Sequence, residues 1–306
     1  MKNSVFAAID IGSHNCRLTV VEKINNNIKV IHNYSHATNL IKNLSYNNEF
    51  TNNNIKNTLE CLKKISKKIT DFKVLHYRCI ATEACRQVIN PEFFINKVKA
   101  ETGIDVEIIS SFEEAKLSLK SCQKYVYGMN KRGYIFDIGG GSTELTYFDQ
   151  NKNIFKTKSV TYGVINLSEK KEVYGSNLVN RELKNHFLSC KNFVDNGSSS
   201  ISIGSCSTVT TLCALFQSLD FFNLKKIEGF KMSSNQLLEI ANYVSKASKD
   251  DLKKKPCIGS RYKLLINGVE ILKYLLNIIP IKEIIVTQRG LRDGIIYELL
   301  NGNEKN

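Results

Sequence analysis

The most distinctive stretch of this chain reads Asp137-Ile138-Gly139-Gly140-Gly141-Ser142-Thr143-Glu144-Leu145. A short apolar run, Tyr134-Ile135-Phe136, comes before it, and Leu145 and Tyr147 follow the turn as apolar residues at alternate positions. This pattern predicts a strand, a glycine-rich turn and a second strand. Because glycine allows a turn to expose several backbone N–H groups toward one point, the stretch predicts a nest that binds phosphate oxygens.

A shorter version of the same pattern stands near the N-terminus, where Asp10-Ile11-Gly12-Ser13 follows the apolar run Val5–Ile9. Taken alone, this turn is also what an ordinary hairpin requires, since Asp before Gly is common in turns. The repeat of Asp-Ile-Gly favours a shared role, and each aspartate supplies a carboxylate for a metal ion or its bound water. Two such turns, one in each half of the chain, indicate a duplicated fold that clasps a phosphorylated ligand between its halves.

Two familiar phosphate-binding turns do not fit these stretches. The dinucleotide-binding turn and the P-loop both open a helix, whereas Ser142–Phe148 reads as a strand. Neither turn contains the Gly-Lys-Ser/Thr of a P-loop.

The composition is that of a soluble globular protein, with 42% hydrophobic and 24% charged residues among 306. That length suits two domains of ordinary size. The chain enters a strand at once and contains no uninterrupted apolar run long enough to span a bilayer, so we expect a cytoplasmic protein without a signal peptide or membrane contact. The nine cysteines include no Cys-x-x-Cys and the five histidines lack metal-ligand spacing, so we expect neither disulfides nor a zinc site.

The net charge is +14, from 43 basic and 29 acidic residues. Such an excess attracts polyanions, including nucleic acid, nucleotides and polyphosphate. Both halves of the chain share the excess and there is no basic tail, so a lysine-rich background composition explains it as well. Charge alone therefore predicts no specific nucleic-acid partner.

The predicted elements follow one order twice. The first half reads as three strands, helix, strand, helix, strand and helix, with the middle elements at Asn52–Ile69, Val74–Ala81, Pro91–Glu101, Asp105–Ser110 and Phe112–Tyr125. The second half restarts at Gly133, after a junction at Gly128–Gly133, and includes a predicted helix at Leu178–Val194. This is the ribonuclease H-like layout of actin-type phosphotransferases, so we predict two such α/β domains, residues 1–128 and 129–306, with an interdomain cleft. The closing helix, Gly290–Leu300, belongs to the second domain or packs back on the first.

Further blocks complete a resemblance to a known family. They are, in order, Ala8–Ser13, Ala81–Arg86, Glu107–Ala115, Asp137–Leu145, Gly163-Val164, Gly204–Thr211 and Gly290–Gly294. In these blocks, from Ala7 to about Leu300, the chain resembles the exopolyphosphatase/guanosine pentaphosphate phosphohydrolase (Ppx/GppA) family of the actin-like ATPase superfamily. The resemblance implies a phosphoanhydride hydrolase that holds phosphate between two domains.

The resemblance also implies a catalytic set: Glu114, Arg86, Asp137 and Glu144. Glu114 would be the general base that deprotonates the attacking water, whereas the residues alone favour Glu113 and Glu114 as complements to the positive end of their helix. Arg86 would bind phosphate through its guanidinium, although a surface helix arginine fits the sequence too. The carboxylates for Mg²⁺ would be Asp10, Asp137 and Glu144, with turn capping as the alternative for Glu144.

Three loops are expected to contact the substrate. Their residues are Asp10, Gly12, Ser13, His14, Asn15 and Arg17; Gly139, Gly140, Gly141 and Ser142; and Gly204, Ser205, Ser207 and Thr208. Departures from the family pattern bear on substrate preference: His14 stands in place of asparagine, Ser207 in place of a common glycine, and Gln288-Arg289 where an acidic residue is frequent. None of them removes the expected base or the triple glycine.

The leading hypothesis is a Mg²⁺-dependent hydrolase that removes terminal phosphate from polyphosphate, guanosine pentaphosphate or both. One alternative is an actin-fold kinase or ATPase, although no adenosine-binding segment can be assigned. Another is a sensor that binds a phosphorylated signal without hydrolysing it. The sequence leaves open the preferred substrate, its chain length, processivity and the oligomeric state, a homodimer included.

Overall fold

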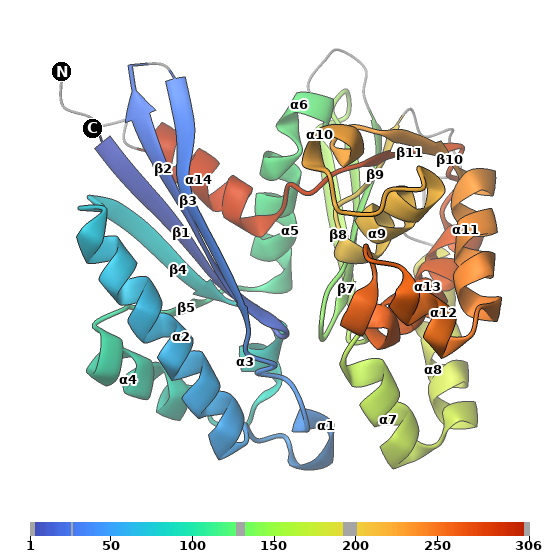
Figure 1. Cartoon of the computed structure of the whole chain (residues 1–306), viewed down its shortest axis with the longest axis horizontal. Coiled ribbons are helices and arrows are strands. Elements are labelled where there is room, and N and C mark those ends of the chain that lie inside the picture. The colour runs from blue at the N-terminus through green and yellow to red at the C-terminus, as the bar shows by residue number, and fades with distance from the viewer. Residues whose placement is uncertain (1–3, 26, 127–131, 192–200, 303–306) are drawn as a thin grey trace. The chain divides into compact units, whose positions relative to one another are not determined.

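A computed structural model describes residues 4–25, 27–126, 132–191 and 201–302 of the chain (Figure 1). The elements form two compact units. Unit 1 comprises Met1–Cys122 and Gly290–Asn306, and unit 2 comprises Gln123–Arg289. The chain therefore passes between the units twice, at Cys122–Gln123 and at Arg289–Gly290.

These boundaries differ from a division into residues 1–128 and 129–306. The first passage lies earlier, and the C-terminal segment from Gly290 onward groups with unit 1. The sequence leaves two alternatives for the closing helix. Its contacts are those of a helix that packs back on the first unit. The predicted junction at Gly128–Gly133 falls largely on residues 127–131, which lie outside the described residues.

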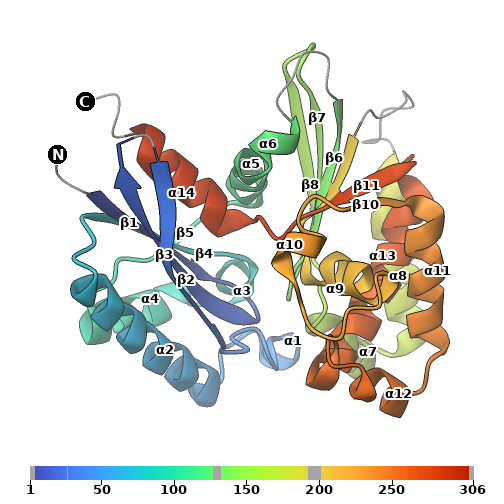
Figure 2. The same cartoon turned by 45° about the horizontal axis from the view of Figure 1, so that its top comes forward.

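Unit 1 contains a five-stranded sheet in the order β3-β2-β1-β4-β5. The strands are β1 (Ser4–Ile11), β2 (Asn15–Ile24), β3 (Asn27–Ala37), β4 (His76–Ala81) and β5 (Glu107–Ile108). The first three form an antiparallel meander, and β4 and β5 run parallel to β1. The helices are α1 (Leu44–Asn47), α2 (Asn52–Asp71), α3 (Glu83–Gln87), α4 (Pro91–Thr102), α5 (Ser111–Ser121) and α14 (Leu291–Gly302). Helices α2 and α4 lie on one side of the sheet, and α5 and α14 lie on the other (Figure 2).

The apolar residues of α14 explain why the C-terminal segment joins unit 1. Ile295, Ile296 and Leu300 are buried in one cluster with Phe6 and Ala8 of β1. Because successive residues of a strand point to opposite faces, Asp10 shares the face of Phe6 and Ala8, the face that α14 covers. Arg78 of β4 adds ion pairs to Glu107 of β5 and Glu298 of α14, both at 2.9 Å.

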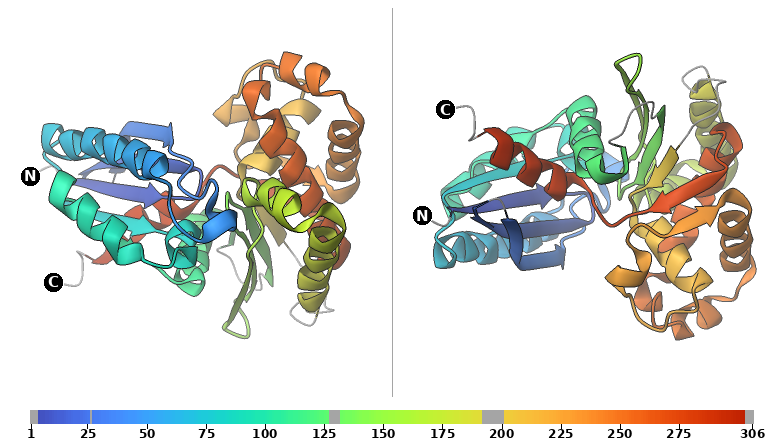
Figure 3. Two further views of the ribbon diagram at one scale, coloured as in Figure 1. Left: turned by 90° about the horizontal axis from the view of Figure 1, so that it is seen from below. Right: turned by 90° about the horizontal axis from the view of Figure 1, so that it is seen from above.

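Unit 2 contains a six-stranded sheet in the order β10-β11-β9-β6-β7-β8. The strands are β6 (Arg132–Ile138), β7 (Thr143–Asp149), β8 (Ile154–Val160), β9 (Ile201–Gly204), β10 (Lys231–Ser233) and β11 (Glu283–Val286). The helices are α6 (Gln123–Val126), α7 (Asn166–Tyr174), α8 (Ser176–Ser189), α9 (Ser207–Phe216), α10 (Leu224–Ile227), α11 (Ser234–Lys246), α12 (Lys249–Lys254) and α13 (Tyr262–Ile278), with a 3₁₀ turn η2 (Gly259–Arg261). Helix α13 packs against α8, α9 and α11 (Figure 3).

The two sheets share one topology, which confirms the predicted pair of ribonuclease H-like domains. The order β8-β7-β6-β9-β11 in unit 2 matches β3-β2-β1-β4-β5 in unit 1. In each unit an antiparallel meander leads into two strands parallel to its first strand. Strand β10 is an addition to unit 2 that pairs antiparallel with β11, and its three residues are too few for an alternating pattern to reveal.

One predicted helix of unit 2 is preceded by a helix that the sequence did not predict. The sequence predicts a helix at Leu178–Val194, whereas α7 precedes it and α8 ends at Ser189. Gly175 separates the two helices in a backbone conformation with φ of 83°, which glycine adopts without strain. The predicted end at Val194 lies outside the described residues.

All nine cysteines are buried and free. In the part of the chain that the structure describes, no helix combines the length and apolar character needed to cross a membrane.

We predict that Gly294→Ala destabilises unit 1. A Cβ at Gly294 would lie 2.1 Å from the backbone oxygen of Leu117, so α14 and α5 would have to separate. Overpacking of this kind costs about 1–3 kcal/mol, measurable as a lower free energy of unfolding in urea. Gly302→Ala is the control, because a Cβ there has nothing within 4 Å. Equal stability of the two variants would show that the α5–α14 contact tolerates a wider spacing.

Candidate functional site: two glycine turns and their supports

The two Asp-Ile-Gly turns have the same geometry. The N–H of Gly12 donates to the carbonyl of Asn15 at 3.0 Å, and the N–H of Gly139 donates to the carbonyl of Ser142 at 2.9 Å. Below the turns, Asp10 pairs with Arg17 across β1 and β2, and Asp137 pairs with Glu144 across β6 and β7. The repeat predicted from the sequence is therefore a structural repeat, residue for residue.

In unit 2 the segment after β8 takes up the carbonyls of the triple glycine. The N–H of Val164 donates to the carbonyl of Gly139 and the N–H of Ile165 to that of Gly140, both at 2.9 Å. The Asn166 side chain donates to the carbonyl of Gly141 at 2.8 Å and accepts from the N–H of Gly163, also at 2.8 Å. Gly163 is so close to the loop that a Cβ there would lie 2.4 Å from the carbonyl carbon of Gly140.

This arrangement determines where the N–H groups of the loop point. The described residues contain no cis peptide bonds, and in a trans peptide the N–H points away from the preceding carbonyl. The N–H groups of Gly140, Gly141 and Ser142 therefore point away from the 163–166 segment. No backbone carbonyl among the described residues accepts from these three groups, so they form a nest suited to an anion.

The first turn has a matching support in unit 1. The N–H groups of Thr38 and Asn39 donate to the carbonyl of His14 at 3.0 and 2.9 Å, and the N–H of Ile41 donates to that of Ser13 at 3.1 Å. The N–H groups of His14 and Asn15 are thereby turned to the opposite side. The His14 ring is held by Asn39, because its Nδ1 lies 2.6 Å from Oδ1 of that side chain.

The two predicted metal carboxylates of unit 2 lie side by side. Asp137 and Glu144 are direct cross-strand partners, so their side chains project from the same face of the sheet. Glu144 is 6% exposed and accepts a hydrogen bond of 2.9 Å from Oγ of Ser159. Glu144 lies within β7, so it is not the cap of a turn.

Two carboxylates suit Mg²⁺, which commonly takes one or two of them and keeps several waters or phosphate oxygens. Among the described residues, no three His, Cys, Asp or Glu side chains gather as a metal site. Asp137 and Glu144 therefore fit a Mg²⁺ ion that arrives with a phosphorylated ligand better than a permanently bound structural metal.

The third predicted loop, Gly204–Thr208, joins the triple glycine at the same sheet edge. Gly204 is the parallel partner of Phe136, the residue before Asp137. The N–H of Ser205 donates to the carbonyl of Phe136 at 3.1 Å. Helix α9 begins at Ser207 with no side-chain cap on its first N–H groups, which favours anions at that end. Ser205 is 8% exposed, and its Oγ has no hydrogen-bond partner in the described part of the chain.

In unit 1 the corresponding edge carries Arg86 and Glu114. Ile11, Ala81 and Ile108 end three parallel strands in register, so the elements that follow them start at one edge. Arg86 of α3 donates to Glu83 from Nε at 2.9 Å and from Nη2 at 2.7 Å. Its Nη1 donates to the carbonyl of Ile109 at 2.9 Å and lies 2.9 Å from Oε2 of Glu114.

Arg86 therefore orients Glu114, and most of its donors are already engaged. Burial lowers the pKa of Arg86, but Glu114 and Glu83 more than offset this and leave its pKa raised. The neighbouring Glu113 lies in the same first turn of α5 and pairs with Arg78 instead.

Sequence reasoning missed Arg292 as a neighbour of the first turn. Arg292 of α14 donates from Nη1 to Oγ1 of Thr19 at 2.8 Å. Burial raises the pKa of Asp10, while the charges of Arg17 and Arg292 oppose that shift. Asp10 thus has two cations beside it, which makes it a weaker candidate for a metal ligand than Asp137. The Gly290–Gly294 motif, which contains Arg292, was the available signal in the sequence. Only the packing of α14 in unit 1 brings Arg292 close to Asp10.

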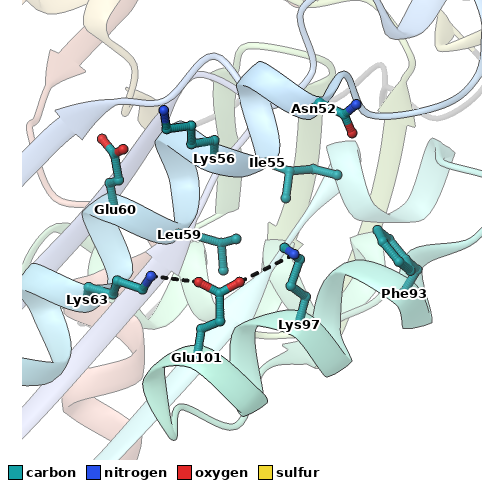
Figure 4. Close-up of a pocket in the computed structure, with 9 residues that line it drawn as sticks. All are labelled: Asn52, Ile55, Lys56, Leu59, Glu60, Lys63, Phe93, Lys97 and Glu101. Atoms are coloured by element: carbon teal, nitrogen blue, oxygen red, sulfur yellow. Dashed lines mark ion pairs between the residues drawn. The ribbon is translucent and has the colours of Figure 1, made fainter.

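A surface pocket of about 370 Å³ lies in unit 1, away from the turns. Helices α2 and α4 form it (Figure 4). Lys63 and Lys97 on its walls both pair with Glu101, at 2.6 and 3.4 Å. None of the predicted site residues lines the pocket, so we do not include it in the site.

Comparison with known proteins shows the family of this chain. The model of the Ppx/GppA phosphatase family matches residues 19–303. The chain belongs to this family. Among solved structures, the Aquifex aeolicus member of the Ppx/GppA family is 25% identical and covers 99% of both chains with a TM-score of 0.81. An exopolyphosphatase from Cytophaga hutchinsonii, 21% identical over 98% of both chains, shares the fold with a TM-score of 0.86.

Two curated Ppx/GppA relatives are longer than this chain. A bifunctional 3-dehydroquinate synthase/phosphatase of Fusobacterium nucleatum is 29% identical over 97% of this chain and 46% of its own length. A guanosine-5'-triphosphate,3'-diphosphate pyrophosphatase of Photobacterium profundum is 21% identical over 97% of this chain and 59% of its own length. The chain thus spans about half the length of these relatives.

We predict that Gly163→Ala lowers the rate of phosphate release by this Ppx/GppA protein without unfolding it. The new Cβ would displace backbone atoms of Gly140 and Gly141, and a misplacement of about 1 Å costs on the order of 10²-fold in rate. Phosphate release from tripolyphosphate measures the loss, thermal unfolding checks the fold, and Gly302→Ala serves as the control. A folded Gly163→Ala variant with full activity would refute the support role of the 163–166 segment.

Proposed function

We propose that this protein is a hydrolase that removes terminal phosphate from inorganic polyphosphate, from guanosine pentaphosphate, or from both. The observation that carries the proposal is the pair of matching turns whose carbonyls are held on one side. Each turn leaves consecutive N–H groups on the other side, and such groups bind phosphate oxygens.

The substrate-binding groups follow from the site. In unit 2 the N–H groups of Gly140, Gly141 and Ser142 would hold one phosphate, with the N-terminus of α9 and the Ser205 hydroxyl beside them. In unit 1 the N–H groups of His14 and Asn15 would hold another. Apart from the Ser205 hydroxyl, these donors are backbone groups, so they recognise phosphate rather than a base or sugar, which is why both substrates remain in the proposal.

Magnesium fits as the counter-ion of the bound phosphates. Asp137 and Glu144 would hold it, and Ser159 orients the Glu144 carboxylate. When bound, Mg²⁺ would offset the negative charge on the anhydride oxygens.

Glu114 is the proposed general base. Its carboxylate would accept a proton from the attacking water, and the base must be held at a defined position for that step. Arg86 provides this hold through its contact of 2.9 Å with Oε2, and Glu83 fixes Arg86 in turn. We therefore propose that Arg86 orients the base, in addition to or in place of binding phosphate directly.

The direct test is phosphate release from long polyphosphate and from guanosine pentaphosphate, side by side, with Mg²⁺ and with a chelator in its place. We expect release from at least one substrate and loss of it without Mg²⁺. Tight binding of both without any release would support a sensor. Phosphate transfer to an added acceptor, in place of release, would support a kinase.

We predict that Glu114→Gln lowers kcat by about 10²–10⁴, the usual cost of losing a general base. The variant keeps the shape of the side chain and removes only its charge, so KM should change little. Glu113→Gln is the matched control, because Glu113 lies in the same helical turn and pairs with Arg78. If kcat of Glu114→Gln stays within a few-fold of wild type, another group activates the water.

A further inference from the structure

Glu228 is a carboxylate that neither the family motifs nor the proposed chemistry uses. It follows α10 directly as its C-terminal cap, and its side chain is 18% exposed. In sequence it is remote from both passages between the units, since it lies 103 residues from Tyr125 and 60 from Gln288. Its partners nevertheless all come from the segments that adjoin these two passages.

The first group of partners belongs to α6, which begins unit 2 at Gln123. Oε1 of Glu228 accepts from the Tyr125 hydroxyl at 2.7 Å and lies 2.9 Å from Nζ of Lys124. Gly229 lets Tyr125 approach, because a Cβ there would lie 3.2 Å from the Tyr125 hydroxyl oxygen.

The second group belongs to the segment after β11, which ends unit 2 at Arg289. Thr287 Oγ1 lies 2.9 and 3.0 Å from the two carboxylate oxygens, and the N–H of Gln288 donates to Oε2 at 2.9 Å. Nε of Arg289 lies 3.5 Å from Oε1. This segment also leaves the sheet edge that carries the triple glycine and Ser205, because Val286 is the parallel partner of Gly204.

We propose that Glu228 is a positioning residue that anchors both connecting segments to the body of unit 2. The two passages between the units, Cys122–Gln123 and Arg289–Gly290, lie directly beyond the anchored segments. The consequence for hydrolysis rests on the proposed function: the anchor holds the segment that leaves the sheet edge carrying the triple glycine and Ser205.

The charges around Glu228 support a permanent anchor. Burial raises the pKa of Glu228, but the Gln288 N–H, Lys124, Tyr125 and Thr287 more than offset this, so its pKa lies below the usual range. The carboxylate faces two cations, Lys124 and Arg289, and accepts from the Tyr125 hydroxyl. The Glu228 carboxylate therefore stays ionised at neutral pH, and its contacts weaken only in acid, as it becomes protonated.

Limited trypsin digestion tests the anchor, because trypsin cleaves after Lys124 and Arg289, one in each segment. In Glu228→Ala we expect cleavage after both residues to rise roughly 10- to 100-fold, since charged hydrogen bonds of this kind contribute about 1.5–3 kcal/mol. Glu228→Gln, which keeps one acceptor, should fall between Glu228→Ala and wild type. Glu283→Ala, which removes an exposed partner of Lys231, is the control and should cleave like wild type.

Cleavage after Lys246 at the end of α11 is the internal reference for general unfolding. If cleavage after Lys124 and Arg289 does not rise relative to Lys246, Glu228 is not an anchor. If it rises at only one of them, the coupling of the two connections is refuted.

In the same variants kcat for phosphate release should fall about 10-fold with little change in KM, with partial rescue in Glu228→Gln. The digestion result stands even if wild type hydrolyses neither substrate, so failure of the anchor and failure of the proposed function are distinguishable.

Discussion

The hydrogen bonds that hold the carbonyls of the two glycine turns on one side are the constraint on which the rest of the site depends. A turn with free carbonyls would present oxygens and N–H groups in mixed directions and would repel phosphate as much as attract it. In unit 2 the carbonyls of Gly139, Gly140 and Gly141 are all taken up by residues 164–166. In unit 1, residues 38–41 take up the carbonyls of Ser13 and His14. The duplicated fold therefore duplicates the support of the turn as well as the turn itself.

Much of this could be predicted from the sequence, because the deciding signals are local. Three successive glycines between two strands have few structural explanations, and Asp-Ile-Gly follows a short apolar run in both turns. The alternating and helical patterns predicted the element order well enough to identify two ribonuclease H-like domains. The family resemblance named Glu114 and Arg86 as site residues, and the parallel register of β1, β4 and β5 explains why they are neighbours at one sheet edge.

The remainder depends on contacts between residues that are far apart in the chain, which no local pattern reveals. Arg86 was expected to face phosphate, but its engagement by Glu83 and the Ile109 carbonyl depends on how α3 meets the end of β5. Arg292 reaches Thr19 only because the apolar face of α14 returns to β1. Glu228 follows an exposed, four-residue helix and had no motif to mark it. Asn166 lies in a stretch whose helix, α7, the sequence did not predict.

The central claim is that the backbone N–H groups of each turn bind phosphate. It is tested most directly by amide NMR of an isotope-labelled Glu114→Gln variant titrated with tripolyphosphate, since we expect this variant to hydrolyse the ligand slowly. We expect saturable shifts of the amide signals of Gly140, Gly141 and Ser142 in unit 2 and of His14 and Asn15 in unit 1, while the Gly302 signal stays in place. Saturable binding of tripolyphosphate that leaves the amides of either turn unchanged would contradict it.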